Sequence, residues 1–237
     1  MGKILTIARR ELAAYFVSPM AYVIGALFLL ASGVWFFHSI FVPGQEASLR
    51  PLFEGMATLM VFVVPLLTMR LVSEEFRSGT IETLMTAPVS DAQVILGKFL
   101  GVMAFYSILL TCTLVFLAMI AAYGQPDVGL AISGYLGMVL LGGMFVSAGL
   151  LTSTVTRYQI VSAILGISLL SLLAIVMQWL VATAPEPLNH LAERMSAMTY
   201  FQDFARGILD TRGLVYFVSM TAMMLFASVK AMESQRW

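Results

Sequence analysis

Apolar and polar residues alternate along this chain in long blocks. Six blocks are almost entirely apolar, and each approaches or exceeds the roughly 17–25 residues with which a helix crosses a hydrocarbon layer of about 30 Å. They are residues 20–42, 53–72, 99–123, 130–155, 160–181 and 213–229. Pro65 lies inside the second block, where its missing N–H group predicts a kink. The pattern therefore predicts six membrane-spanning helices separated by polar segments.

The densest polar segment, residues 70–98, lies between the second and third spans. It contains seven of the chain's 13 basic and 13 acidic residues, so it should lie in water. Ile81, Leu84 and Met85 fall on one helical face after Gly79, a spacing that predicts a short amphipathic helix on the membrane surface. A plain capped loop is the alternative interpretation.

The end of this segment carries signals for a break and a new helix. Pro88 stops the short helix, and Ser90 and Gln93 have the spacing of a capping box. The new helix should continue into the third span. A short helix held between two long ones would act as a stiff lever that transmits a push from a soluble partner.

Two further segments combine apolar and polar residues at helical spacing. Residues 1–18 predict an interfacial helix along the cytoplasmic surface. Its apolar face is Leu5, Ala8, Leu12, Tyr15 and Phe16, and its polar face is Lys3, Thr6 and Arg10. Residues 182–212 predict an external amphipathic helix or a re-entrant pair before the last span.

The fourth span has small residues four positions apart. These pairs are Ser133 with Gly137 and Gly143 with Ser147. Small residues at this spacing let helix backbones approach closely in lipid. We favour packing inside the subunit over a seam between two copies.

The composition supports an all-α integral membrane protein with a single transmembrane domain over residues 1–237. The chain is 60% hydrophobic and only 11% charged, which is far too apolar for a water-soluble fold. Its formal net charge of zero gives no electrostatic reason to bind nucleic acid. We expect membrane lipids to surround it.

Candidate catalytic and cofactor sites are not legible in the sequence. Cys112 is the only cysteine and there are two histidines, so neither a disulfide nor a zinc site is expected. Gly97 and Lys98 are followed by Phe99 and lack the upstream glycine of a phosphate-binding loop. We expect a non-catalytic subunit with no cofactor and no metal of its own.

The distribution of Lys and Arg predicts the orientation. With the N-terminus inside, the cytoplasmic segments carry nine of them: Lys3, Arg9, Arg10, Arg70, Arg77, Lys98, Arg157, Lys230 and Arg236. The external segments carry four: Arg50, Arg194, Arg206 and Arg212. Both termini should therefore be cytoplasmic. Glu54, Arg70 and Lys98 fall near span ends, where their charges are expected to reach water.

Particular stretches resemble a known family. SEEFRSGTIETLMTAPVSDAQVILGKFLG resembles the cytoplasmic coupling segment of permeases of type-2 ATP-binding-cassette (ABC) exporters. FQDFARGILDTRGLVYFVSMTAMMLFASVKAME and IARRELAAYFVSPMAYVIGALFLL resemble the permease group of gliding-motility-associated ABC transporters, whose close relatives occur in many bacteria that do not glide. The likeness covers nearly the whole chain.

The resemblance implies a dimeric membrane unit of six spans per subunit in the bacterial inner membrane. It implies a separate cytoplasmic ABC ATPase in two copies, which would hold ATP and Mg, and a second copy of this permease or a homologous one. A companion protein with a large extracytoplasmic domain is a further possible partner.

The resemblance and the apolar face together give the candidate site residues. The positions that match the coupling segment are Glu74, Glu75, Arg77, Gly79, Thr80, Glu82 and Leu84, and Ile81 and Met85 complete the apolar ridge. The positions that match an external motif are Asp203, Arg206, Gly207, Asp210 and Arg212. For that motif, charge pairing that pins a re-entrant helix and a simple solvated face are both open.

These observations leave two main functional hypotheses. The first is a permease that couples ATP hydrolysis in a partner to export or to mechanical work across the membrane. The second is a scaffold that anchors a partner complex and moves no substrate. A membrane-embedded enzyme is disfavoured because no catalytic set of residues is recognisable.

Overall fold

The computed structural model describes residues 2–40, 49–79, 89–123, 127–186 and 188–234, and every regular element in these ranges is a helix. Within them, six helices or helix runs are long and apolar enough to cross a membrane. They are α2 (Pro19–Ile40), α3 (Arg50–Thr68), α6 (Asp91–Tyr123), α7 (Val128–Val155), the run from α8 (Gln159–Ser171) to α9 (Met177–Thr183), and α12 (Thr211–Ser234). The protein is an all-α integral membrane protein, as the apolar blocks predict.

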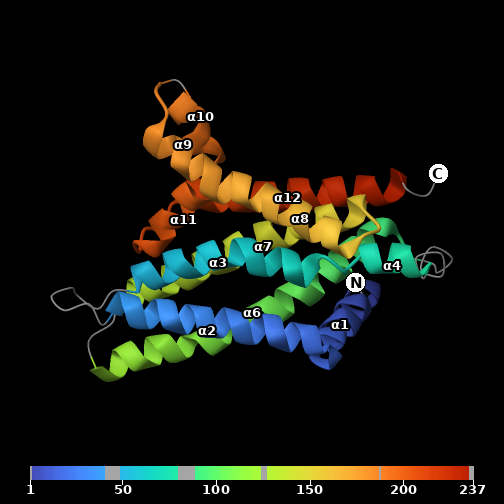
Figure 1. The fold of residues 1–237 in the computed structure, drawn as a ribbon, viewed down its shortest axis with the longest axis horizontal. Coiled ribbons are helices and arrows are strands. Elements are labelled where there is room, and N and C mark those ends of the chain that lie inside the picture. The colour runs from blue at the N-terminus through green and yellow to red at the C-terminus, as the bar shows by residue number, and fades with distance from the viewer. Residues whose placement is uncertain (1, 41–48, 80–88, 124–126, 187, 235–237) are drawn as a thin grey trace.

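Helix α7 forms the centre of the bundle. Figure 1 shows it among the other long helices, with α3 and α12 alongside it. Every residue from 141 to 150 is buried, and Phe145 and Met144 are fully enclosed. Gly142 allows this density, because a Cβ there would lie 2.1 Å from Cε1 of Tyr106. The central helix of a bundle in lipid therefore needs small side chains as well as apolar ones.

The predicted close packing of small residues in this span occurs inside the subunit. Ser133 donates a hydrogen bond of 2.8 Å to the backbone oxygen of Phe204, and a Cβ on Gly137 would lie 2.6 Å from the Cβ of Phe204. Ser147 is also fully buried. Gly143 makes only ordinary contacts, since its nearest neighbour would be Thr221 Oγ1 at 3.8 Å.

The fifth span is interrupted by a π-helical turn, η1 (Leu172–Val176), between α8 and α9. Such turns hold one more residue than an α-helical turn and change the direction of the faces that follow. Beyond α9, α10 (Leu188–Met195) packs against α9, and the two project from the side of the bundle (Figure 1). α11 (Ala197–Ala205) then returns to α7. The segment predicted to be external therefore contains a pair of short helices, α10 and α11.

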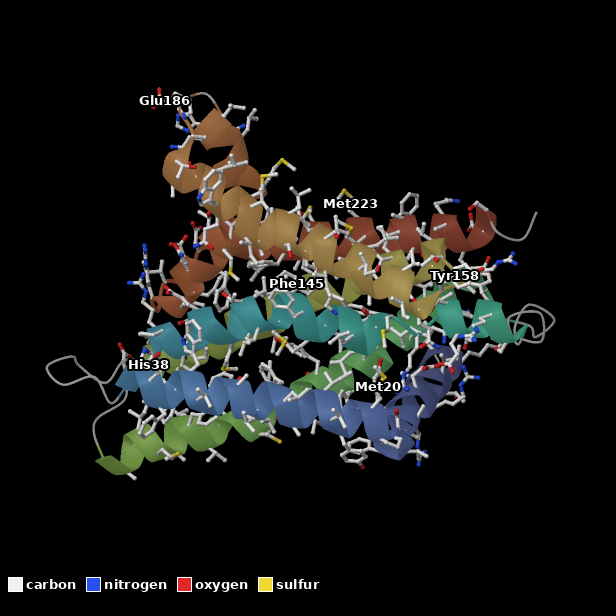
Figure 2. The ribbon with its side chains drawn as sticks, viewed as in Figure 1. Met20, His38, Phe145, Tyr158, Glu186 and Met223 are labelled. Atoms are coloured by element: carbon white, nitrogen blue, oxygen red, sulfur yellow. The ribbon has the colours of Figure 1, made fainter. Side chains whose placement is uncertain are left out.

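Two short helices lie at the other end of the bundle. They are α1 (Gly2–Val17), which packs against α6, and α4 (Ser73–Ser78), which follows α3. Figure 2 shows that Met20 and Tyr158 lie near this end, whereas His38 lies at the opposite end. The last residues of α12 also lie on this side of the bundle, near α1 and α4 (Figure 1).

The residues of the predicted apolar face of α1 differ in burial. Ala8 and Tyr15 are buried as expected, but Leu5 is 69% exposed and Phe16 44% exposed. Leu5 is therefore largely uncovered by other helices, whereas Phe16 still contacts α6 through an edge-to-face arrangement with the ring of Phe105, with centroids 6.0 Å apart. Glu11, which the sequence did not single out, lies on the side that contacts α6.

Candidate functional site

The candidate site begins where α3 ends and α4 starts. The backbone N–H groups of Val72 and Ser73 donate hydrogen bonds of 3.1 and 3.2 Å to the hydroxyl of Ser153 on α7. That hydroxyl donates in turn to the backbone oxygen of Met69 at 3.2 Å, and Ser73 Oγ also donates to Met69 O. The start of α4 is thereby fixed to the central helix.

Helix α4 carries the acidic pair of the predicted coupling segment and ends at a glycine. Glu74 and Glu75 lie in its first turn, where negative charge favours a helix, and Arg77 lies in its last turn. Gly79 follows with φ of 72°, a left-handed conformation that glycine adopts at little cost. The sequence did not predict this helix.

Several predicted coupling residues lie outside the described residues. They are Thr80, Ile81, Glu82, Leu84 and Met85, together with the expected amphipathic helix and its stop at Pro88. Past them, the predicted capping box is confirmed. Ser90 N donates to Gln93 Oε1, and Gln93 N donates to Ser90 Oγ, each at 3.3 Å. Helix α6 begins there and continues into the third span.

A buried lysine joins three helices at this end of the bundle. Lys98 on α6 is 1% exposed, and its Nζ donates to Glu11 Oε1 on α1 at 3.1 Å and to Glu75 Oε1 on α4 at 2.7 Å. Its third hydrogen bond goes to the backbone oxygen of Leu71 at 2.7 Å. All three protons of the ammonium group are therefore used. The expectation that Lys98 reaches water is wrong, because the neighbouring carboxylates replace that water.

Arg10 completes the cluster at its outer edge. Its Nη2 lies 3.0 Å from Glu11 Oε1 and 3.6 Å from Glu75 Oε1, while the arginine side chain itself is 56% exposed. We call Arg10, Glu11, Glu75 and Lys98 the ion-pair cluster. Removing one partner of a buried pair leaves an uncompensated charge and costs about 3–5 kcal/mol. The cluster therefore ties α1, α4 and α6 to one another.

Two glycines of α6 bring α1 close enough for this contact. A Cβ on Gly97 would lie 2.7 Å from the Cβ of Ile7, and one on Gly101 would lie 2.9 Å from the backbone oxygen of Ala8. Larger residues at either position would push α1 away and separate Glu11 from Lys98. The four-residue spacing of these glycines around Lys98 was the sequence signal that could have located the cluster.

Tyr15 anchors the other end of α1. Its hydroxyl donates a 2.7 Å hydrogen bond to the backbone oxygen of Leu67 at the end of α3. Burial raises the pKa of the Tyr15 phenol well above its ordinary value, so the donor proton is retained at all physiological pH values. Its ring stacks on Phe105 of α6 with centroids 4.8 Å apart.

The motif predicted to be external forms the corner between α11 and α12. Gly207 has φ of 88°, and the N–H of Ile208 donates to the oxygen of Asp203 at 2.9 Å, which closes the end of α11. Asp210 Oδ1 then accepts a 2.9 Å hydrogen bond from the N–H of Arg212 at the start of α12.

The charge pairing considered for this motif is not seen within the described ranges. Asp203, Arg206, Asp210 and Arg212 form no ion pair with one another there. Arg206 and Arg212 are exposed, so the arginines of the motif have solvated heads, while Gly207 and the side chain of Asp210 shape the backbone.

Comparison with known proteins agrees with this architecture. The sequence matches the family described as ABC-2 family transporter protein over residues 5–229. That range includes five spans in full, most of α12 and the full ion-pair cluster. A search of curated proteins found no match.

Proposed function

This chain belongs to the ABC-2 family of transporter proteins, the membrane permeases of ABC transporters, and we propose that it carries work from a separate cytoplasmic ATPase into the bilayer. The observation that supports this proposal most directly is the buried Lys98. It links α4, which leads into residues 80–88, to both α1 and α6. A force applied beyond Gly79 would therefore move three helices together.

The proposed direction of coupling requires the α1 and α4 end to face the cytoplasm. The excess of Lys and Arg in the segments assigned to that side supports this orientation, with both termini inside the cell. A cysteine introduced beside Pro187 should then be labelled from outside, and one beside Pro88 should not. The opposite labelling pattern would overturn the orientation.

The further features proposed for the complex rest on the sequence resemblance. We propose two ATPase copies holding ATP and Mg, a second permease copy or homologue, and the bacterial inner membrane as the location. Export and mechanical work across the membrane are both compatible with a helix that is pushed from one side. The likeness to gliding-motility-associated permeases and the companion extracytoplasmic protein stay predictions.

The test measures movement of α1 in the complex with its ATPase. Spin labels at Ala13→Cys on α1 and Ser234→Cys on α12, in a Cys112→Ala background, report the separation of the two helices. ATP should change the separation of the two labels in the protein whose ion-pair cluster is intact. The change should be lost when Glu11→Gln, Glu75→Gln and Lys98→Met are combined, although the ATPase still co-purifies. An unchanged response in this triple variant would refute coupling through the cluster.

A further inference from the structure

Helix α1 lies where the first span begins. It ends at Val17, and α2 starts at Pro19. Figure 1 shows α1 running across the direction of the long helices at that end of the bundle. An amphipathic helix in this position lies among the headgroups of the adjacent leaflet. The side of α1 that meets the lipid is set by its contacts with the bundle.

The rotation of α1 about its axis is fixed by contacts on one side. Ala8 and Tyr15 are buried, and the carboxylate of Glu11 is engaged in the ion-pair cluster. The corner between α1 and α2 is held as well, because the hydroxyl of Tyr22 donates a 2.8 Å hydrogen bond to the backbone oxygen of Phe16. The opposite side of α1 is therefore held facing away from the bundle.

That opposite side combines apolar residues with one arginine. Leu5 and Phe16 are exposed, and Arg9 lies between them. Spacings of four and seven residues place the three side chains on one helical face, which we call the α1 stripe. Arg9 is exposed and forms no ion pair with any residue that the structure describes. Its long stem can lie along the apolar stripe while the guanidinium reaches the headgroup layer.

The exposed charge of α1 is positive. Its three basic residues, Lys3, Arg9 and Arg10, are exposed, whereas its one acidic residue, Glu11, binds Lys98 of α6. Each Lys or Arg near a membrane surface adds to the attraction for anionic lipid. A zwitterionic headgroup brings a positive group of its own, which the same residues repel. The charge of this surface therefore favours an anionic headgroup.

The neighbouring carboxylates lie on another side of the helix. Glu11, Glu74 and Glu75 line a cavity of about 260 Å³ beside the ion-pair cluster, together with Ala14. At 3.6 residues per turn, Ala14 is about 140° around the helix from Arg9. The cavity carboxylates therefore do not occupy the side on which Arg9 lies.

We propose that the α1 stripe binds an anionic phospholipid of the leaflet beside α1. The Arg9 guanidinium holds the lipid phosphate, because its planar N–H groups can donate two parallel hydrogen bonds to phosphate oxygens. The acyl chains lie against Leu5, Phe16 and the exposed Val17. The proposal does not depend on coupling to an ATPase.

Native mass spectrometry of the full-length protein in detergent tests the lipid preference. The probes are phosphatidylglycerol and phosphatidylcholine with identical acyl chains. We expect phosphatidylglycerol to bind about fivefold more tightly, the factor that one basic side chain near an anionic surface contributes. Arg9→Gln should remove this preference. Arg206→Gln, which removes an exposed arginine after α11, should keep it. Equal binding of the two lipids, or an unchanged preference in Arg9→Gln, would overturn the proposal.

Moving the charge along α1 separates the stripe from net charge. Ala13 and Ala14 are both exposed, but Ala13 lies one turn after Arg9 and Ala14 lines the cavity. In the Arg9→Gln background, Ala13→Arg should restore the preference for phosphatidylglycerol. Ala14→Arg should not restore it, because the cavity carboxylates bind the new guanidinium. Restoration by both variants, or by neither, would refute the stripe as the site.

A third variant tests the apolar part of the stripe. Leu5→Gln should weaken the binding of both lipids by the same factor and leave their ratio unchanged, because Leu5 contacts the acyl chains. Its exposure means that the size-exclusion profile should not change. Soluble glycerophosphoglycerol, which is the headgroup without acyl chains, should not displace phosphatidylglycerol. Unchanged affinities in Leu5→Gln, or displacement by the soluble headgroup, would refute binding of a phospholipid along the stripe.

Discussion

Replacing Lys98 with methionine should destabilise the protein strongly, although the two side chains are similar in length and flexibility. The substitution leaves Glu11 and Glu75 side by side without their shared cation, and Leu71 O without its donor. Breaking a buried pair costs about 3–5 kcal/mol. Both carboxylates border the cavity, so partial hydration should bring the loss to the lower end of that range.

Thermal unfolding followed by tryptophan fluorescence would measure this loss. At roughly 2–4 °C per kcal/mol for a chain of this size, Lys98→Met should lower Tm by about 6–12 °C. Lys230→Met is the matched control, because Lys230 pairs with Glu233 at 2.7 Å but is 58% exposed. An exposed pair contributes about 0–1 kcal/mol, so the Tm of Lys230→Met should change little.

A triple variant separates the effect of lost charge pairing from the effect of lost packing. Combining Glu11→Gln and Glu75→Gln with Lys98→Met removes all three charges, so neither carboxylate is left as an uncompensated charge. We expect the triple variant to recover most of the lost Tm. If Lys98→Met instead unfolds at the same temperature as Lys230→Met, the lysine is not held as the structure describes and the coupling proposal loses its basis.

Three further predictions address the partner and the packing. Leu84→Asp should abolish co-purification of the ATPase and leave membrane insertion intact. Burying a leucine contributes about 1.5–3 kcal/mol to binding, and a buried charge opposes it. Full binding of the ATPase by this variant would mean that residues 80–88 do not dock it through an apolar ridge. The purified chain alone should show no ATPase activity, and turnover that survives removal of contaminants would contradict this. Gly142→Ala should lower Tm markedly because its Cβ would meet Tyr106, whereas Gly143→Ala should be tolerated. Equal changes in Tm for the two variants would refute the close contact between Gly142 and Tyr106.

Features set by local sequence were predicted well. The six spans follow from runs of apolar residues, and the capping box at Ser90 and Gln93 follows from the chemistry of a helix N-terminus. Both depend on residues that are neighbours in the chain. The small residues Ser133 and Gly137 also indicated close packing, although not that Phe204 would be the partner.

The ion-pair cluster could not be predicted in the same way. Glu11 and Lys98 are far apart in the sequence, and each alone is compatible with a charged residue at a water-exposed span end. Only the crossing of α1 over α6 brings them together. Likewise, the exposure of Leu5 depends on which side of α1 meets α6 and not on the amphipathic pattern itself.

The enclosure of α7 has a consequence for the biogenesis of the chain. Residues 141–150 are buried, and α12, the sixth of the described spans in chain order, supplies part of that cover. Spans that are inserted one after another reach their final packing only in a later association step. Until α12 arrives, the side of α7 near Gly143 lacks its neighbour Thr221. Chains truncated before Thr211 should therefore insert in the membrane, fail to assemble, and be degraded by membrane quality-control proteases.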